Sequence, residues 1–282
     1  MRSHIQEYLD WKAGYAPPAA NRYRIHLVRF NQVTRKPITE IVPSDVGRFQ
    51  EMMRHKYSES TIAYATMILK DFFLFFANEV HINPRHIKRP KFLSRPHHAL
   101  TREEYEKMHA TLNEWEFWDL QKLLILEILW DTGMRVSELC DLVTAQMDSV
   151  IRQTQIETKK HKTLRWVMWS GQTHEHLLRF VGSRIVMNQY PHLLLSQEKR
   201  RAKLSTRTVQ RWIKEICARA GTGRNISPHS FRHAKAHEIL RQGGNVKEIQ
   251  LILGHSENNP LAAFSYLRLN QDEFTTVANK YL

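Results

Sequence analysis

The chain is poor in cysteine and has no long uninterrupted apolar run. Its 282 residues include only Cys140 and Cys217, too few for a disulfide framework or a zinc site built from cysteines. The longest apolar run, Leu123 to Trp130, is interrupted by Glu127 and falls well short of the roughly 20 residues that cross a bilayer. The N-terminal sequence lacks the apolar core of a signal peptide. We therefore expect a soluble, cytoplasmic protein.

Acidic side chains are in deficit. The chain has 42 lysines and arginines but only 28 aspartates and glutamates, so its formal net charge at pH 7 is +14 with histidine counted as neutral. A surplus of this size points to a polyanionic partner, with nucleic acid first and an anionic membrane surface second. The chain is nevertheless 42% hydrophobic and 10% aromatic, which excludes a disordered basic tail. Its length favours two domains.

A basic segment that contains prolines follows a helical first part. Over residues 1–90 apolar side chains recur at spacings of three and four, as in Ile62 to Phe76, which predicts short helices. Residues 83–98, the basic strap, lose this period and carry three prolines. We expect the strap to lie along DNA phosphates, with a solvated linker as the plain alternative. Its proposed DNA-binding side chains are Arg85, Lys88, Arg89, Lys91 and Arg95.

The second part of the chain opens with a capping box formed by Thr101 and Glu104. A buried helix follows and ends at Gly133. From about 147 to 169 the pattern changes to Ile, Thr, Val and Trp around a lysine-rich centre, which predicts a small antiparallel sheet with a basic hairpin tip. Periodic segments at 209–220, 230–242 and 246–253 predict three more helices. The fold class is therefore mainly α, with a helical domain at 1–90, a linker at 91–99 and a mixed domain at 100–282.

Two of the polar motifs in the second domain place arginines where they could bind phosphate. Arg135 falls at a helix start after Gly133, and Glu138 lies one turn on, where a carboxylate can orient the guanidinium. His229 and Arg232 are three residues apart and share a helical face. Taken singly, such pairs are more often surface ion pairs or satisfied polar residues.

Two further motifs lie near the C-terminus. His255 follows a glycine at a helix end, and Tyr266 lies eleven residues beyond it. Each also has a plain alternative, since a lone histidine is usually a satisfied polar residue and a lone tyrosine usually packs in a core.

Taken in order, these segments resemble the tyrosine recombinase, or phage integrase, family, which includes the Xer and Cre recombinases. The chain contains TGMRVSEL, the hairpin KKHKTLRW, then HSFRH and LGHS, at family-like separations. The resemblance covers the whole second domain. The helical first domain resembles the SAM-like core-binding domain of the family, and the two together imply a C-shaped clamp on DNA.

The resemblance implies a role for each residue that matches a motif. Two arginines and a histidine would bind the scissile phosphate, a tyrosine would attack it and a hairpin lysine would protonate the leaving 5′-oxygen, while Glu138 would hold the first arginine in place. The implied catalytic set is Arg135, Lys159, His229, Arg232, His255 and Tyr266. Lys162 is the alternative to Lys159 as general acid, and Lys160 and Lys162 are implied DNA contacts. The family chemistry implies no metal and no cofactor.

The position of the nucleophile departs from the family pattern. The family places its tyrosine nine residues after the histidine of the LGH motif, where this chain has Phe264. The Tyr-Leu-Arg sequence that begins at Tyr266 matches the family from the other side, so a two-residue insertion around 257–260 accounts for the offset. Tyr281 is a remote second candidate.

The resemblance implies a site-specific DNA recombinase that works through a covalent 3′-phosphotyrosyl intermediate and a Holliday junction. Its partners would be a double-stranded recombination site, three further copies docked through the C-terminal helix at 271–282, and an accessory or heterologous recombinase in some systems, but no membrane. In the cell it would be cytoplasmic and associated with the nucleoid. The alternatives are a type IB topoisomerase-like nicking and closing enzyme and a catalytically silent DNA-binding regulator. Trapping of a covalent adduct separates the regulator from the two enzymes.

Overall fold

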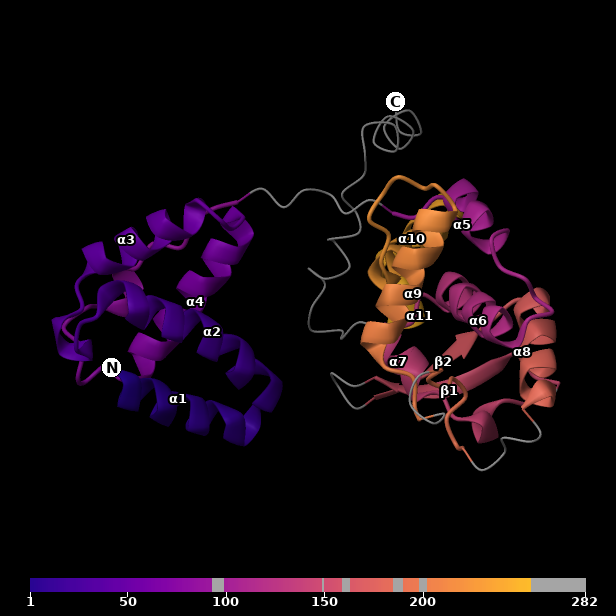
Figure 1. The fold of residues 1–282 in the computed structure, drawn as a ribbon, viewed down its shortest axis with the longest axis horizontal. Coiled ribbons are helices and arrows are strands. Elements are labelled where there is room, and N and C mark those ends of the chain that lie inside the picture. The colour runs from indigo at the N-terminus through magenta and orange to yellow at the C-terminus, as the bar shows by residue number, and fades with distance from the viewer. Residues whose placement is uncertain (93–98, 149, 159–162, 185–189, 198–201, 255–282) are drawn as a thin grey trace. The chain divides into compact units, whose positions relative to one another are not determined.

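The computed structural model describes residues 1–282 except 93–98, 149, 159–162, 185–189, 198–201 and 255–282. The chain divides into two compact units, Met1–Arg95 and Pro96–Leu282. The described part is mainly helical, with one antiparallel pair of strands, and this confirms the predicted fold class (Figure 1). No described helix combines the length and the apolar character that a membrane crossing requires.

The first unit packs its helices around α4. Its helices are α1 (Arg2–Tyr15), α2 (Pro17–Thr34), α3 (Pro43–Arg54) and α4 (Glu59–Phe75), with 3-10 turns η1 (Ile38–Glu40) and η2 (Pro84–His86). Buried side chains along α4, among them Ile62, Leu69 and Phe73, meet buried residues of the other helices. These helices are longer than the short ones predicted, with 18 residues in α2 and 17 in α4. Within α1 to α4, prolines stand only at the first two positions of α2 and the first position of α3, where the N–H has no partner within the helix.

The start of the basic strap is anchored to the first unit. Ile87 is buried in the core, and the Gln50 side chain donates to the Lys88 carbonyl oxygen at 3.0 Å. The side chains of Arg85, Lys88, Arg89 and Lys91 are exposed, whereas Arg95 lies outside the described residues. The described part of the strap, residues 83–92, therefore presents its basic groups to solvent from a backbone anchored by Ile87 and Gln50.

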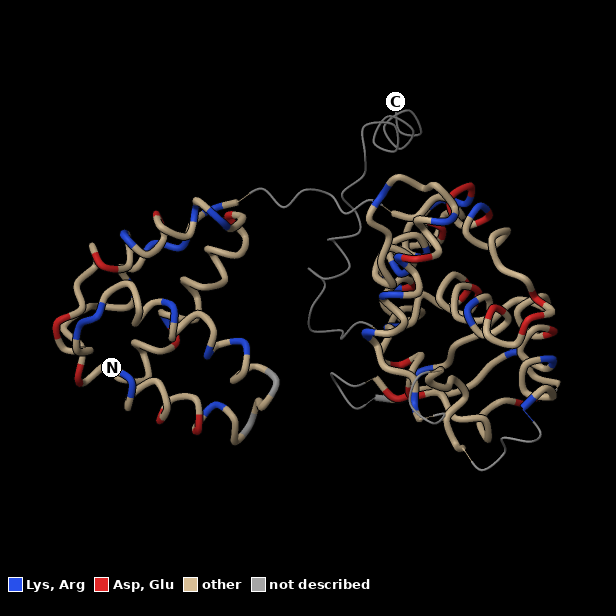
Figure 2. Tube along the Cα trace, in the orientation of Figure 1, with Lys and Arg blue, Asp and Glu red and all other residues tan. Residues whose placement is uncertain are grey.

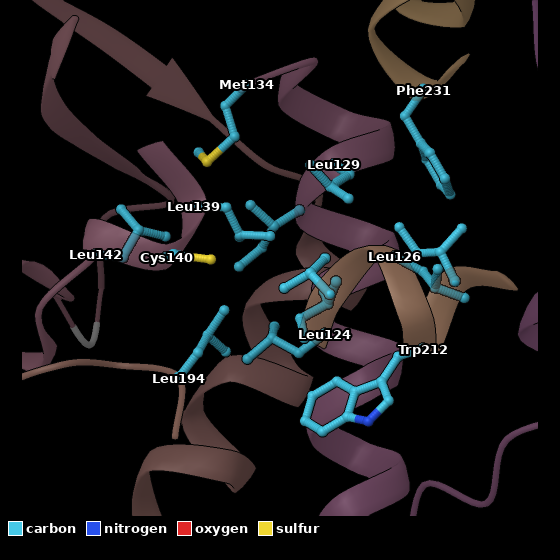
Figure 3. Packing of buried hydrophobic residues seen from close by; sticks show 14 of the residues in the cluster. Leu124, Leu126, Leu129, Met134, Leu139, Cys140, Leu142, Leu194, Trp212 and Phe231 are labelled. Atoms are coloured by element: carbon cyan, nitrogen blue, oxygen red, sulfur yellow. The ribbon is translucent and has the colours of Figure 1, made fainter. Parts of the chain in front are cut away.

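The second unit surrounds the long helix α6. Its elements are α5 (Arg102–His109), α6 (Phe117–Thr132), α7 (Val136–Asp141), η3 (Thr144–Gln146), β1 (Gln153–Thr158), β2 (Thr163–Met168), α8 (Gly171–Ser183), α9 (Thr206–Arg219), α10 (Pro228–Arg241) and α11 (Val246–Leu253). Helix α6 packs against α8 on one side and α10 on another. Figure 3 shows Leu124 and Leu129 of α6 among side chains from α7, α9 and α10, which form one cluster.

The boundaries of the elements follow local signals in the sequence. The predicted capping box is confirmed, because the Glu104 N–H donates to Thr101 Oγ1 at 3.2 Å and the Thr101 N–H donates to Glu104 Oε2 at 2.9 Å. Helix α6 ends at Gly133 in the left-handed conformation, and α11 has the predicted bounds. Helix α10 begins two residues earlier than predicted, because Pro228 suits the first helical position. Helix α8 was not predicted.

The two strands form a hairpin whose tip, 159–162, lies outside the described residues. They pair antiparallel from Gln153 opposite Met168 to Thr158 opposite Thr163. Because side chains alternate between the faces of a strand, Ile156 and Val167 are buried in the core of the unit. The register brings the end of β1 to the hairpin tip, which contains the lysines singled out by sequence.

Candidate active site

Arg135 stands at the junction of α6 and α7, where the core fixes the chain on both sides. Met134 precedes Arg135 and Leu139 follows it on α7, and both are buried in the cluster shown in Figure 3. Their packing fixes the backbone on either side of Arg135. The Arg135 N–H donates to Glu138 Oε2 and Arg135 Nη1 donates to Glu138 Oε1, each at 2.9 Å. The Arg135 side chain remains 31% exposed. One carboxylate thus holds both the backbone and the guanidinium of Arg135.

Glu138 also binds a second arginine. Its side chain is fully buried, and Oε2 accepts a hydrogen bond from Arg165 Nη2 of strand β2 at 2.9 Å. Burial acts to raise the pKa of Glu138, but the Arg135 N–H and the charges of Arg165 and Arg135 together outweigh it and hold that pKa below its ordinary value. Glu138 is therefore an anion at neutral pH that links α7 to the hairpin.

Arg232 joins two other segments of the unit. It lies on α10 and is 2% exposed. Its Nη1 donates to the Gly133 carbonyl oxygen at 2.9 Å, and its Nη2 donates to the Leu253 carbonyl oxygen at 2.6 Å. Each acceptor lies two residues before a sequence-predicted site residue, Gly133 before Arg135 and Leu253 before His255. A single buried guanidinium therefore fixes the turn before Arg135 and the end of α11.

Two glycines allow these segments to approach closely. A Cβ on Gly133, where φ is +57°, would lie 2.6 Å from Leu253 Cδ2. A Cβ on Gly254, where φ is +66°, would lie 2.5 Å from Arg165 Cδ and 3.2 Å from Thr158 Cγ2. Thr158 is the last residue of β1 and precedes Lys159 in the chain. The structure therefore places the described neighbours of Arg135, Lys159 and His255 together.

His229 lies in the first turn of α10, one turn before Arg232. Its side chain is exposed, and its ring centroid is 4.7 Å from that of His233 in an edge-to-face arrangement. It lines a pocket of about 530 Å³ with Arg224, Ser227 and Ser230. The pocket offers hydroxyl, imidazole and guanidinium groups at the positive end of a helix, where an anion is favoured.

Several predicted residues lie outside the described part of the chain. They are Lys159, Lys160, Lys162, His255 and Tyr266, together with Arg95 of the strap. Arg165 was not predicted as a site residue, although the quoted hairpin motif contains it. The alternation of inward and outward side chains along β2 could have identified it, because Arg165 takes an inward position between the outward-facing Leu164 and Trp166.

Charge is spread over both units. Figure 2 shows lysines and arginines along helices of each unit, so the surplus is not confined to a terminal tail. Within the described residues, no three or more histidine, cysteine or acidic side chains are arranged to hold a metal ion.

Comparisons with known proteins give the family and the fold. A model of the phage integrase family matches residues 98–272. A tyrosine recombinase of Thermosipho africanus is 24% identical over 97% of this chain and 96% of its own length. The structure of the XerH site-specific recombinase in a post-cleavage complex with palindromic difH substrate matches with a TM-score of 0.78 and 18% identity, covering 100% of this chain and 85% of that chain.

A further solved structure shares the fold. The lambda integrase tetramer bound to a Holliday junction matches with a TM-score of 0.72 and 19% identity, covering 91% of this chain and 77% of that chain. The family model spans well over half of the sequence and includes all four motifs. The chain therefore belongs to the phage integrase family of tyrosine recombinases.

Proposed function

We propose that this tyrosine recombinase cuts and rejoins DNA at a specific site through a covalent 3′-phosphotyrosyl intermediate. One observation carries the proposal: buried arginines join the turn before Arg135, the hairpin strand and the end of α11 into one structure. Three motifs that are far apart in sequence are thereby brought next to one another. Stability alone does not require the ends of three motifs to meet at one point, whereas a phosphate-binding site does.

The chemistry proposed for this point is electrostatic. Arg135, Arg232 and His229 would contact the non-bridging oxygens of the scissile phosphate, where negative charge develops during phosphoryl transfer. Glu138 keeps the Arg135 guanidinium in one orientation, so little reorganisation is needed when the phosphate arrives. Arg232 is held in one orientation by its bonds to the Gly133 and Leu253 carbonyl oxygens.

The proposed nucleophile is the phenolic oxygen of Tyr266. It forms a bond to phosphorus while the bond from phosphorus to O5′ breaks, leaving a 3′-phosphotyrosyl ester and a 5′-hydroxyl. The phenolic proton passes to solvent or to His255, and Lys159 donates a proton to O5′. A phenol with an ordinary pKa of about 10 needs nearby cations to ionise at neutral pH. The new ester has nearly the energy of the phosphodiester, so religation needs no further energy source.

Binding of the duplex would use both units. The exposed Arg85, Lys88, Arg89 and Lys91 of the strap would contact phosphates, as would Lys160 and Lys162 of the hairpin. Such contacts release counterions and make affinity fall steeply with salt. We further propose that a core-binding domain at 1–90 and a catalytic domain at 100–282 close on the DNA as a clamp, and that four copies assemble on paired sites through the segment at 271–282.

The test is a covalent trapping experiment. The protein is incubated with a pool of nicked duplexes randomised on both sides of the nick, so that cleavage releases a short strand and religation is blocked. Protein-linked DNA is then captured under denaturing conditions and sequenced. We expect a captured population with a shared sequence at the cleavage position, and no capture with Tyr266→Phe.

A matched variant and the remaining outcomes sharpen this test. Tyr281→Phe should retain full capture, because Tyr281 is not the proposed nucleophile. Capture lost in Tyr281→Phe but kept in Tyr266→Phe would move the nucleophile to Tyr281. Tight DNA binding by the wild-type protein without any captured strand would refute the enzymatic proposal and leave a DNA-binding regulator. Capture without shared sequence would indicate a nicking and closing activity without site specificity.

A further inference from the structure

Residues 164–166 of strand β2 depart from the usual pattern of a half-buried strand, in which apolar side chains face the core and charged ones face solvent. Leu164 and Trp166 are 67% and 58% exposed, whereas Arg165 between them is 8% exposed. Burying a charged group is costly unless it is paired and hydrogen-bonded. Specific partners must therefore compensate the burial of Arg165, and these partners lie on two other elements.

The two ends of the Arg165 guanidinium bind different segments. Nη2 donates to Glu138 Oε2 at 2.9 Å, and Nη1 donates to the Ile252 carbonyl oxygen at 2.6 Å. The Arg165 side chain also lies against Gly254, which has no side chain that would displace it. One planar group thus spans from the carboxylate that holds Arg135 to the last turn of α11, next to His255 in sequence.

Arg165 also has a donor that these contacts leave unused. Its Nε is buried and has no hydrogen-bond partner among the described residues. Burial lowers the pKa of Arg165, and the Glu138 carboxylate opposes this effect. Stability alone is a weak reason for a buried arginine such as Arg165, because replacing a whole buried ion pair by well-packed apolar side chains is often neutral. Its two-sided contact to Glu138 and α11 points to a role in geometry.

We propose that Arg165 is a positioning residue for DNA cleavage. It acts through Glu138 on Arg135 and through Ile252 on the segment that begins at Gly254 and His255. Because it belongs to the same hairpin as Lys159, it ties the strand that carries the general acid to the groups that bind the phosphate. This inference rests on the proposed function. Arg165 itself need not touch the DNA.

The experiment measures the single-turnover rate of covalent adduct formation at saturating DNA, using a nicked duplex selected from the captured pool. Arg165→Met should lower this rate roughly 10- to 100-fold, because small displacements of catalytic groups have effects of that size. The dissociation constant for the uncleaved duplex should change less than about threefold, since only orientation is lost.

Arg184→Met is the matched control. Arg184 is likewise a buried arginine of the second unit, but it donates to Thr144 Oγ1 and to the carbonyl oxygens of Leu193 and Tyr190, none of which holds a site residue. Its loss should lower the melting temperature and leave the cleavage rate of the folded protein unchanged. Equal loss of cleavage rate in both variants would show that Arg165 acts on stability only.

Coupling to Glu138 distinguishes positioning from an independent effect. If Arg165 acts in part through Glu138, combining Arg165→Met with Glu138→Gln should slow cleavage less than the product of the two single effects. Full multiplication of the two effects would overturn the proposed path.

Arg165→Lys decides the question if Arg165→Met does not fold. A lysine keeps the charge beside Glu138 but cannot span both acceptors, so its cleavage rate should lie below that of the wild type. If Arg165→Lys cleaved at the wild-type rate, simultaneous contact with Glu138 and Ile252 would not be required for cleavage. The outcomes also separate the two proposals. No adduct from the wild-type protein would refute the proposed function, whereas a normal adduct from both Arg165 variants would refute this inference alone.

Discussion

Glu138 is the group whose replacement most directly perturbs the framework of the site. Its buried carboxylate accepts from the Arg135 N–H, from Arg135 Nη1 and from Arg165 Nη2, all at 2.9 Å. Glu138→Gln keeps the shape but removes the charge and replaces one acceptor oxygen with an NH₂ donor that faces other donors. Two guanidinium groups then lose their shared anion.

The expected loss of stability follows from the burial of these groups. Removing one partner of a buried ion pair costs about 3–5 kcal/mol. The lower end applies, because Arg135 is 31% exposed and solvent can take up part of its charge. About 3 kcal/mol corresponds to a fall in melting temperature of roughly 6–12 °C for a unit of this size.

Thermal unfolding followed by tryptophan fluorescence measures this change in the relevant unit, because six of the seven tryptophans lie beyond residue 100. Glu103→Gln is the control, since Glu103 forms an exposed pair with Lys107, and it should leave the melting temperature nearly unchanged. If Glu138→Gln and Glu103→Gln had the same melting temperature, the contacts of Glu138 with Arg135 and Arg165 would not stabilise the unit as argued.

The pH dependence of the same difference provides a second check. Folding lowers the pKa of Glu138. Its charge therefore contributes fully to the free energy of unfolding above the ordinary pKa of about 4.3, and this contribution is lost as pH falls through the pKa of the folded state. The gap between wild type and Glu138→Gln should stay constant from about pH 8 to 5 and shrink below about pH 4. A gap that widened in acid would contradict the sign of the shift.

Three further outcomes are expected. Gly254→Ala should lower both the melting temperature and the cleavage rate, because the added Cβ would clash with the Arg165 side chain. Gly221 has a similar φ of +62° but open space around it, so Gly221→Ala should show only the backbone penalty of about 1 kcal/mol. Arg232→Lys should lose one of two carbonyl contacts and destabilise the unit by about 2 kcal/mol in urea unfolding. Burial raises the pKa of the Cys217 thiol, so iodoacetamide at pH 8 should modify it only after unfolding.

Much of the second unit was predictable because its boundaries depend on local chemistry. Thr101 and Glu104 form a cap through groups three residues apart, and Gly133 and Gly254 end helices where the backbone turns left-handed. The i,i+3 spacing of Arg135 and Glu138 likewise predicts a local contact, because Arg135 caps α7 and Glu138 is the third residue of that helix. Such signals need no knowledge of the rest of the chain.

The long-range contacts could not be predicted in this way. The bond from Arg232 to the Gly133 carbonyl joins residues 99 apart in sequence, and that from Arg165 to the Ile252 carbonyl joins residues 87 apart. A carbonyl acceptor leaves no trace in the identity of the residue that carries it. Arg165 was therefore overlooked, although its inward place between exposed Leu164 and Trp166 identifies it once the strand is known.

Peptide mapping of the captured adduct determines whether Tyr266 is the residue that becomes covalently linked to DNA. Trypsin releases Tyr266 in the peptide 248–268, which contains no other tyrosine, and releases Tyr281 separately after Lys280. After nuclease digestion, we expect a nucleotide mass on the peptide 248–268, and fragmentation should place it on Tyr266. A nucleotide found on any other peptide, or none on the captured protein, would contradict this assignment.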